Sequence, residues 1–330
     1  MTEDLKPRID WIPPALLLAI MLAGFALIGS PSTWVTLTIA GLAMGLLIFI
    51  MSSGLTLVFG LMDVMNFAHG LFIAVGAYVA VSVMKFFSAA ADSESFLVNL
   101  GALLPAMLAA AAVAGLLGLF FERVIVRPVY GQHLKQILIT TGGMIVAEQL
   151  IHVLWGPDLL PLPRPSALRG AFLVGDMAIE KFRLVAVVTG LVVFAAMILL
   201  LNRTKIGLLI RAGVENKEMV EAMGYRIRRL FVAVFVAGSA LAGLGGALWG
   251  MYQESVTVGI GAQMMVLIFI VIIIGGLGSV GGCFTGALLV GLVANYVGYL
   301  SPKIALGSNI LLMVLVLLWR PQGLYPMSKQ

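Results

Sequence analysis

The chain has 330 residues, of which 61% are hydrophobic and 11% are charged, and its formal net charge is +5. Soluble domains carry about 25% charged residues, and so much apolar surface would aggregate in water, so the composition excludes an ordinary soluble protein. A bilayer solvates such surface, in agreement with the mean hydropathy of +1.10. The positive charge lies in short segments between apolar runs, which indicates membrane topology rather than nucleic-acid binding.

Ten apolar runs follow one another along the chain, and a membrane-crossing helix needs about 20 such residues. The expected helices cover residues 12–29, 34–52, 64–84, 97–121, 137–155, 183–202, 230–251, 263–277, 282–300 and 304–319. The short apolar stretch 53–63 either extends the second helix or forms a broken or re-entrant piece. We therefore predict an all-α integral membrane protein with about ten transmembrane helices. The first run lacks a small-residue cleavage pattern and is read as a retained helix.

Charges between the helices predict the orientation. The loop 203–229 carries seven positive and three negative residues, and the loop 122–136 carries three and one, so both should face the cytoplasm. The loop 156–182 has no net charge, which suits the outside. With ten spans, the transmembrane domain 12–320 then lies between a cytoplasmic N-terminal segment, 1–11, and a cytoplasmic tail, 321–330.

Small residues recur every four positions in two of the runs. They are Ala106, Ala110, Ala114 and Gly118 in one run, and Gly238, Ala242, Gly246 and Gly250 in another. Such spacing lets helices pack closely in lipid, either as ordinary packing or as an interface that matters for transport. The pattern Gly-Leu-x-x-Val-x5-Gly also occurs twice, at 60–70 and 276–286, as in transporters built from repeats with discontinuous helices.

Polar residues at membrane depth are the candidates for a substrate pathway. Asp63, Asn66 and His69 cluster before the third helix. They either line or gate a pathway, or they form a helix start with Asp63 as N-cap and His69 bonded to backbone. Glu148 and His152 lie four residues apart, which favours a structural pair over a proton relay.

Further pathway candidates are Thr140, Thr141 and, more weakly, Gln263. The two threonines precede a pair of glycines, so they could contact substrate or ease helix packing. One cysteine, Cys283, and three histidines predict no disulfide, no metal site and no cofactor. The sequence has no phosphate loop and no nucleophile motif, so we expect no catalytic activity and, for ATP-driven transport, separate ATPase subunits.

The loop 203–229 contains a run of helix-forming residues from Glu215 to Met223, followed by Gly224. A glycine in that position is typical of a helix end. A short helix in a cytoplasmic loop either docks a partner protein or anchors the chain at lipid headgroups.

Several motifs now point to one family. Gly54-Leu-Thr-Leu-Val-Phe-Gly60 runs into Asn66-Phe-Ala-His-Gly70, and Glu122-Arg123-x3-Arg127-Pro128, Gly275-Gly-Leu-Gly-Ser-Val280 and Arg320-Pro-Gln-Gly-Leu324 follow. With the loop Arg211-Ala212-x9-Ala222-Met-Gly224, they resemble branched-chain amino acid ABC transporter permeases of the LivH type. The resemblance covers about residues 35–325.

This resemblance implies a type II importer-like fold in a bacterial inner membrane. It also implies a second, LivM-like permease, two ATPase subunits and a periplasmic substrate-binding protein as partners. The coupling helix seated on an ATPase would then include Arg211, Glu215, Glu218, Glu221, Ala222 and Gly224.

Two departures from the family pattern leave the substrate open. Leu71 stands where many relatives are acidic, and Gly281-Gly282 stands where relatives often have Pro-Gly. Branched-chain or related amino acids, urea, short amides and small carboxylates are all compatible. A proton-coupled secondary transporter and a passive channel are the alternatives from other classes, although neither needs a docking helix.

Overall fold

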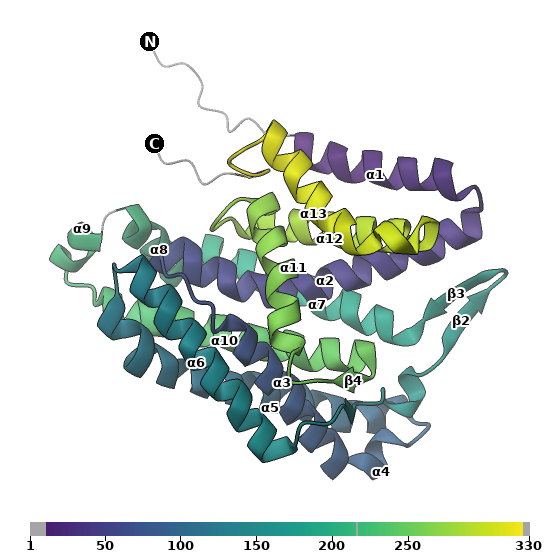
Figure 1. Cartoon of the computed structure of the whole chain (residues 1–330), viewed down its shortest axis with the longest axis horizontal. Coiled ribbons are helices and arrows are strands. Elements are labelled where there is room, and N and C mark those ends of the chain that lie inside the picture. The colour runs from purple at the N-terminus through teal and green to yellow at the C-terminus, as the bar shows by residue number, and fades with distance from the viewer. Residues whose placement is uncertain (1–10, 216, 326–330) are drawn as a thin grey trace.

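The computed structural model describes residues 11–215 and 217–325, and helices dominate it (Figure 1). The N-terminal half contains α1 (Ile12–Ile28), α2 (Pro31–Met62), α3 (His69–Phe86), α4 (Ser88–Ala91), α5 (Phe96–Phe121), the π-helix η1 (Glu122–Val126), the 3-10 helix η2 (Arg127–Val129) and α6 (His133–Trp155). The C-terminal half contains α7 (Lys181–Arg203), α8 (Lys205–Glu215), α9 (Lys217–Ala222), α10 (Ile227–Gln253), α11 (Ile260–Gly275), α12 (Val280–Leu300) and α13 (Pro302–Trp319).

Each of the ten expected apolar runs forms a helix. Among the described residues, seven helices are long and apolar enough to cross a membrane, and α1, α11 and α13 are shorter apolar helices. The all-helical class of an integral membrane protein is thus confirmed, whereas ten crossings and the type II arrangement stay predictions. Residues 1–10 and 326–330 lie outside the described part. The cytoplasmic location of the N-terminal segment and of the C-terminal tail therefore stays a prediction.

Two expected boundaries were wrong, those of the third helix and of the loop 122–136, and one of the two alternatives for the stretch 53–63 is confirmed. The stretch 53–63 extends α2, which runs unbroken for 32 residues, about 48 Å at 1.5 Å per residue. The third helix starts at His69, because residues 63–68 form a connector. Most of the expected loop 122–136 is helical, since η1 and η2 continue α5.

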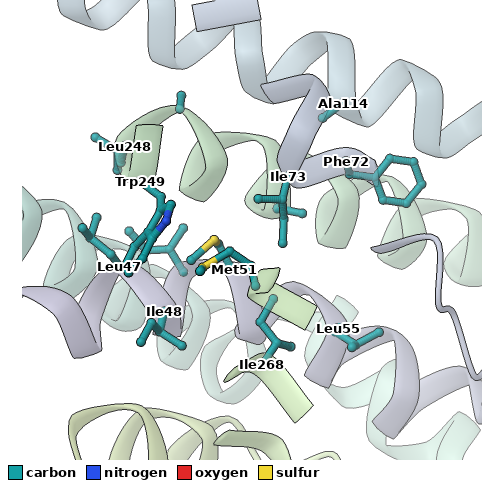
Figure 2. Packing of buried hydrophobic residues seen from close by; sticks show 14 of the residues in the cluster. Leu47, Ile48, Met51, Leu55, Phe72, Ile73, Ala114, Leu248, Trp249 and Ile268 are labelled. Atoms are coloured by element: carbon teal, nitrogen blue, oxygen red, sulfur yellow. The ribbon is translucent and has the colours of Figure 1, made fainter. Parts of the chain in front are cut away.

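The core surrounds the middle of α2, which contacts α12, α10, α7 and α11. Figure 2 shows Leu47 and Met51 of α2 among Ile73 of α3, Trp249 of α10 and Ile268 of α11. All five side chains are buried. By contrast α6 lies at the surface, and its exposed leucine, isoleucine and valine side chains suit contact with lipid.

Glycines bring α2, α3 and α10 close together. A methyl group on Gly54 would meet the backbone of Gly238, and one on Gly76 would meet the backbone of Gly243. Ala106, Ala110 and Ala114 are also fully buried. The small-residue runs therefore serve tight helix packing, as expected. The two repeated motifs also meet, since a methyl group on Gly60 would touch Gly278.

Short strands organise the loop 156–182, for which no strands were expected. The strand β1 (Leu160–Pro161) pairs with β4 (Ser255–Val256), and β2 (Ala171–Val174) forms a hairpin with β3 (Met177–Glu180). The β1–β4 pairing joins this loop to the segment that follows α10.

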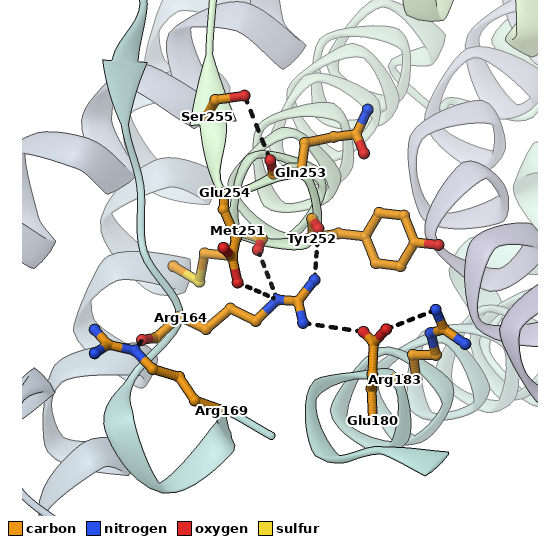
Figure 3. A network of polar contacts seen from close by, with 9 residues as sticks. All are labelled: Arg164, Arg169, Glu180, Arg183, Met251, Tyr252, Gln253, Glu254 and Ser255. Carbon is orange, nitrogen blue, oxygen red and sulfur yellow. Dashed lines mark hydrogen bonds and ion pairs between the residues drawn. The ribbon is translucent and has the colours of Figure 1, made fainter. Parts of the chain in front are cut away.

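Arg164 fastens the same loop to the end of α10 (Figure 3). Its guanidinium donates to the carbonyls of Met251 at 3.2 Å and Tyr252 at 2.8 Å, and it pairs with Glu180 at 3.0 Å and Glu254 at 3.2 Å. A planar guanidinium satisfies several acceptors at once, and here it bonds two of the last carbonyls of α10. Because α10 begins beside the loop 203–229, that loop and the loop 156–182 lie at opposite ends of one helix.

The C-terminal segment returns to α11. The N–H of Leu324 donates to the carbonyl of Ile274 at 2.8 Å, and the N–H of Tyr325 donates to that of Gly275 at 3.0 Å. Leu324 is fully buried. The terminal Arg-Pro-Gln-Gly-Leu motif therefore closes the end of α11.

Candidate functional site

The connector 63–68 between α2 and α3 is the centre of the candidate pathway. Asp63 ends α2 in a left-handed conformation, with φ +53°, and its side chain is exposed. The N-cap position of α3 is occupied by Ala68. The expectation that Asp63 is the N-cap of the third helix was therefore wrong, because five further residues separate it from the helix.

Three side chains from one face of α6 hold this connector. His133 lies 3.6 Å from the Asp63 carboxylate, Gln136 accepts from the Met65 N–H at 3.3 Å, and Thr140 accepts from the Phe67 N–H at 3.2 Å. The connector contributes every second residue and α6 contributes positions i, i+3 and i+7. Gln136 and Thr140 thus give partners to two backbone N–H groups of the connector that are not hydrogen-bonded within a helix.

The candidates Asn66 and His69 are both buried. The Asn66 side-chain oxygen accepts from the Ala68 N–H at 3.1 Å, and the His69 Nε2 donates to the carbonyl of Met51 at 2.9 Å. The expected bond between His69 and backbone is thus present, although to α2 rather than to its own helix. Asn66 Nδ2 and His69 Nδ1 are buried and lack a hydrogen-bond partner among the described residues.

Side chains bond four consecutive carbonyls of α2 where His69 meets it. Ser52 donates to Phe49, Ser53 to Ile50, His69 to Met51 and Thr56 to Ser52, at 2.9–3.3 Å. Hydroxyl groups that bond a carbonyl of the preceding turn often bend a helix slightly. The imidazole of His69 therefore links this turn of α2 to the first residue of α3, directly after the connector.

The other pathway candidates lie apart from this group. Thr141 and Gln263 are exposed, while Thr140 is fully buried and bonds backbone. Glu148 and His152 make no hydrogen bond or ion pair with each other among the described side chains, but the two groups are close enough to interact electrostatically, so their structural pairing stays a prediction. A separation of four residues permits that contact on a helix but does not impose it.

The loop 203–229 forms α8 and α9, and the expected helix end is present. Gly224 has φ +85°, its N–H donates to the carbonyl of Glu221, and the N–H of Tyr225 donates to that of Val220. This pair of bonds is a Schellman motif, which closes a helix with a left-handed residue. The side chains of Arg211, Glu215 and Glu218 lie outside the described part, while Glu221 and Ala222 are exposed.

Beside this loop, η1 buries an acidic side chain. Glu122 is fully buried, and its carboxylate accepts from the Tyr130 hydroxyl at 2.7 Å. Burial and the hydrogen bond to Glu122 raise the pKa of Tyr130 above its usual range, so the hydroxyl stays a donor. Tyr130 also contacts the ring of Phe231 in α10.

Two side chains important to this geometry were absent from the expected sites. Gln136 is buried and bridges Met65 to the carbonyl of Val129, and Arg164 holds α10. The sequence could have indicated Gln136, because it precedes the candidate Thr140 by four residues and therefore lies on the same face of the helix. Arg164 has no comparable signal, since its partners are distant in sequence.

These features define a class of protein: a polytopic membrane protein with a short helical pair in one of its loops. Residues 37–319 match the family described as the branched-chain amino acid transport system, permease component. The chain belongs to this family.

Curated relatives agree over most of their length. The permease protein BraD of the high-affinity branched-chain amino acid transport system of Pseudomonas aeruginosa is 30% identical over 296 residues, which are 86% of this chain and 93% of BraD. LivH of Escherichia coli K12 is 27% identical, with 86% and 92% covered. A probable LivM permease of Methanocaldococcus jannaschii is 25% identical, with 85% and 90% covered. No solved structure matches the chain significantly.

Proposed function

We propose that this chain is a membrane-spanning subunit of an ABC importer that moves branched-chain or related hydrophobic amino acids across a bacterial inner membrane. The observation that carries the proposal is the family match over 37–319, which includes the connector and the loop 203–229. BraD and LivH are named as permeases for branched-chain amino acids. The sequence contains no phosphate loop, so separate ATPase subunits supply the energy.

The end that carries α8 and α9 faces the cytoplasm in this proposal, because its loop is strongly basic. The short helix α9 then seats on an ATPase subunit. Its end exposes the apolar side chains of Met223 and Tyr225, which are 62% and 48% exposed. Glu221, Ala222 and Gly224 belong to this docking element, together with Arg211, Glu215 and Glu218.

A second, related permease completes the pathway. Thr141 and Gln263 are exposed on helices α6 and α11. Polar groups at membrane depth face a water-filled path or another protein, since contact with lipid is costly. The LivH and LivM relatives both resemble this chain, which supports a pair of related permeases.

The connector 63–68 is the part of this chain that we assign to gating. Unsatisfied buried polar groups cost about 1–3 kcal/mol each, and Asn66 and His69 supply two of them. A rearranged connector would release that cost by giving both groups partners. The opposite end, with the loop 156–182, receives substrate from a periplasmic binding protein.

Reconstitution tests the proposal. The chain is placed in proteoliposomes with a LivM-like permease, with or without ATPase subunits and a binding protein, and uptake of radiolabelled leucine is measured. We expect uptake only with ATP and all partners, and urea and acetamide should not compete. Leucine uptake by the chain alone would contradict the proposal, and ATP-dependent uptake of urea in place of leucine would reassign the substrate.

A further inference from the structure

Four arginines from two separate segments surround one hollow at the α8–α9 end. This basic hollow is lined by Arg123 of η1, Arg127 of η2, Arg228 and Arg229 of α10, and Val232, and its volume is about 350 Å³. All four arginines are exposed. Among the described side chains, none of the four forms an ion pair.

The electrostatics of the basic hollow favour an anion. Arg228 and Arg229 lie in the first turn of α10, where the helix dipole is positive and acidic side chains are preferred. Glu122, although it neighbours Arg123, is buried and bonded to Tyr130. A second carboxylate, that of Glu221, lines an adjacent hollow with Arg228 and Arg229. Among the described side chains that line the two hollows, positive charges therefore outnumber carboxylates.

An apolar stripe leads away from the basic hollow along η1 and α5. Leu116, Phe120 and Val124 recur every four residues and are 67%, 54% and 55% exposed. Arg123 and Arg127 follow the same helical path, and α5 packs closely against α10. Basic side chains at the end of an exposed apolar helix face lie at the depth of lipid headgroups.

We propose that the basic hollow binds the phosphate of an anionic phospholipid, whose acyl chains lie along Leu116, Phe120 and Val124. Arginine suits this role because its planar guanidinium donates two parallel hydrogen bonds to a phosphate. An acidic surface of an ATPase subunit would bind the same arginines, but it would not account for the exposed apolar side chains of Leu116, Phe120 and Val124 that lie next to them. The four arginines and the adjacent apolar stripe together favour a phospholipid over an ATPase subunit as the ligand.

Native mass spectrometry of the full chain in detergent tests the site, with phosphatidylglycerol and phosphatidylcholine as probes. We expect phosphatidylglycerol to bind more tightly than phosphatidylcholine. The double variant R123Q/R127Q should weaken phosphatidylglycerol binding about thirtyfold, which corresponds to about 1 kcal/mol per arginine near an anionic surface. R228Q/R229Q, on the other segment, should do the same. The matched control K135Q/R203Q removes two exposed cations outside the hollow and should bind normally.

Several outcomes would overturn the site. Equal binding of the two lipids, normal binding by both arginine variants, or an equal loss in the control would each do so. If the arginine variants bind phosphatidylglycerol normally but no longer retain ATPase subunits, the hollow is a protein-docking surface instead. Displacement of the lipid by millimolar inorganic phosphate would show a free-anion site. None of these readouts depends on leucine transport, so the result is independent of the proposed function.

Discussion

The backbone N–H of Phe67 donates to the hydroxyl oxygen of Thr140 at 3.2 Å, which ties a segment without regular structure to α6. The same hydroxyl donates to the carbonyl of Gln136 at 2.7 Å, so its orientation is determined by its own helix. Because α6 lies at the surface, such bonds account for much of its attachment to the connector.

The substitution Thr140→Val keeps the shape of the side chain and removes the acceptor. The partly buried N–H of Phe67 then loses this partner, which should lower the free energy of unfolding by about 1 kcal/mol. Thermal denaturation in detergent measures the effect as a lower apparent Tm. Thr141→Val is the matched control, because Thr141 is exposed, and it should leave the Tm nearly unchanged. Equal losses in the two variants would contradict the connector bond.

Gln136→Leu should destabilise the protein at least as much. The Gln136 amide bridges the N–H of Met65 and the carbonyl of Val129, so both groups lose a partner, at a cost of about 2 kcal/mol or more. Gln149→Leu, at an exposed position of α6, serves as the control. Limited proteolysis between α2 and α3 should accelerate only in the first variant. Unchanged cleavage there would show that Gln136 does not hold the connector.

Arg164→Lys tests the attachment of α10 to the loop 156–182. A single ammonium cannot reach both carbonyls and both carboxylates, so we expect a loss of about 2–3 kcal/mol despite the retained charge. Arg169→Lys alters an exposed pair with Asp92 and should cost less than about 1 kcal/mol. The denaturation midpoints of the two variants measure these losses, and the midpoint of Arg164→Lys should fall further. A lysine that fully replaces Arg164 would mean that charge alone matters.

Gly224→Val should damage the end of α9. A β-branched residue at φ +85° costs about 1–2 kcal/mol, whereas Gly224→Asn tolerates that conformation better. Gly213→Ala, inside α8, meets only a side-chain methyl group of Ile227 at ordinary distance and should be tolerated. In an assembled transporter, stimulation of ATPase activity by loaded binding protein should fall in the valine variant and recover with asparagine. Full stimulation in the valine variant would count against a coupling role.

Gly76→Ala should separate α3 from α10. Its methyl group would meet the backbone of Gly243, which cannot move aside, and overpacking of this kind costs about 1–3 kcal/mol. Gly142→Ala, where nothing lies within 4 Å, is the control on α6. Monodispersity after heating, measured by size-exclusion chromatography, reports the difference. If Gly76→Ala is as heat-resistant as the control, α3 and α10 do not approach each other closely at Gly76 and Gly243.

Hydropathy predicted the helices better than their ends. Each apolar run became a helix because the bilayer requirement is a property of local composition. The start of α3 was misjudged because Asp63 is equally compatible with the start and with the end of a helix, and only its left-handed backbone identifies it as the end of α2. The glycine at 224 was unambiguous, since a left-handed helix end strongly favours that residue.

Contacts between distant segments could not be predicted in the same way. The partners of Arg164 come from α10 and from the β2–β3 hairpin, and no local pattern joins them. His69 was expected to bond backbone, yet only the fold identifies Met51 as its acceptor. The pathway candidates Thr140 and Thr141 are adjacent in sequence but lie on different sides of α6, one buried and one exposed.

The return of the chain to α11 constrains protein engineering. The N–H groups of Leu324 and Tyr325 bond the carbonyls of Ile274 and Gly275, and Leu324 fills a fully buried position. A chain cut before Leu324 would leave both carbonyls without these donors and open a hole at the junction of α11 and α12. Affinity tags, fluorescent fusions and truncation series should therefore begin beyond Tyr325.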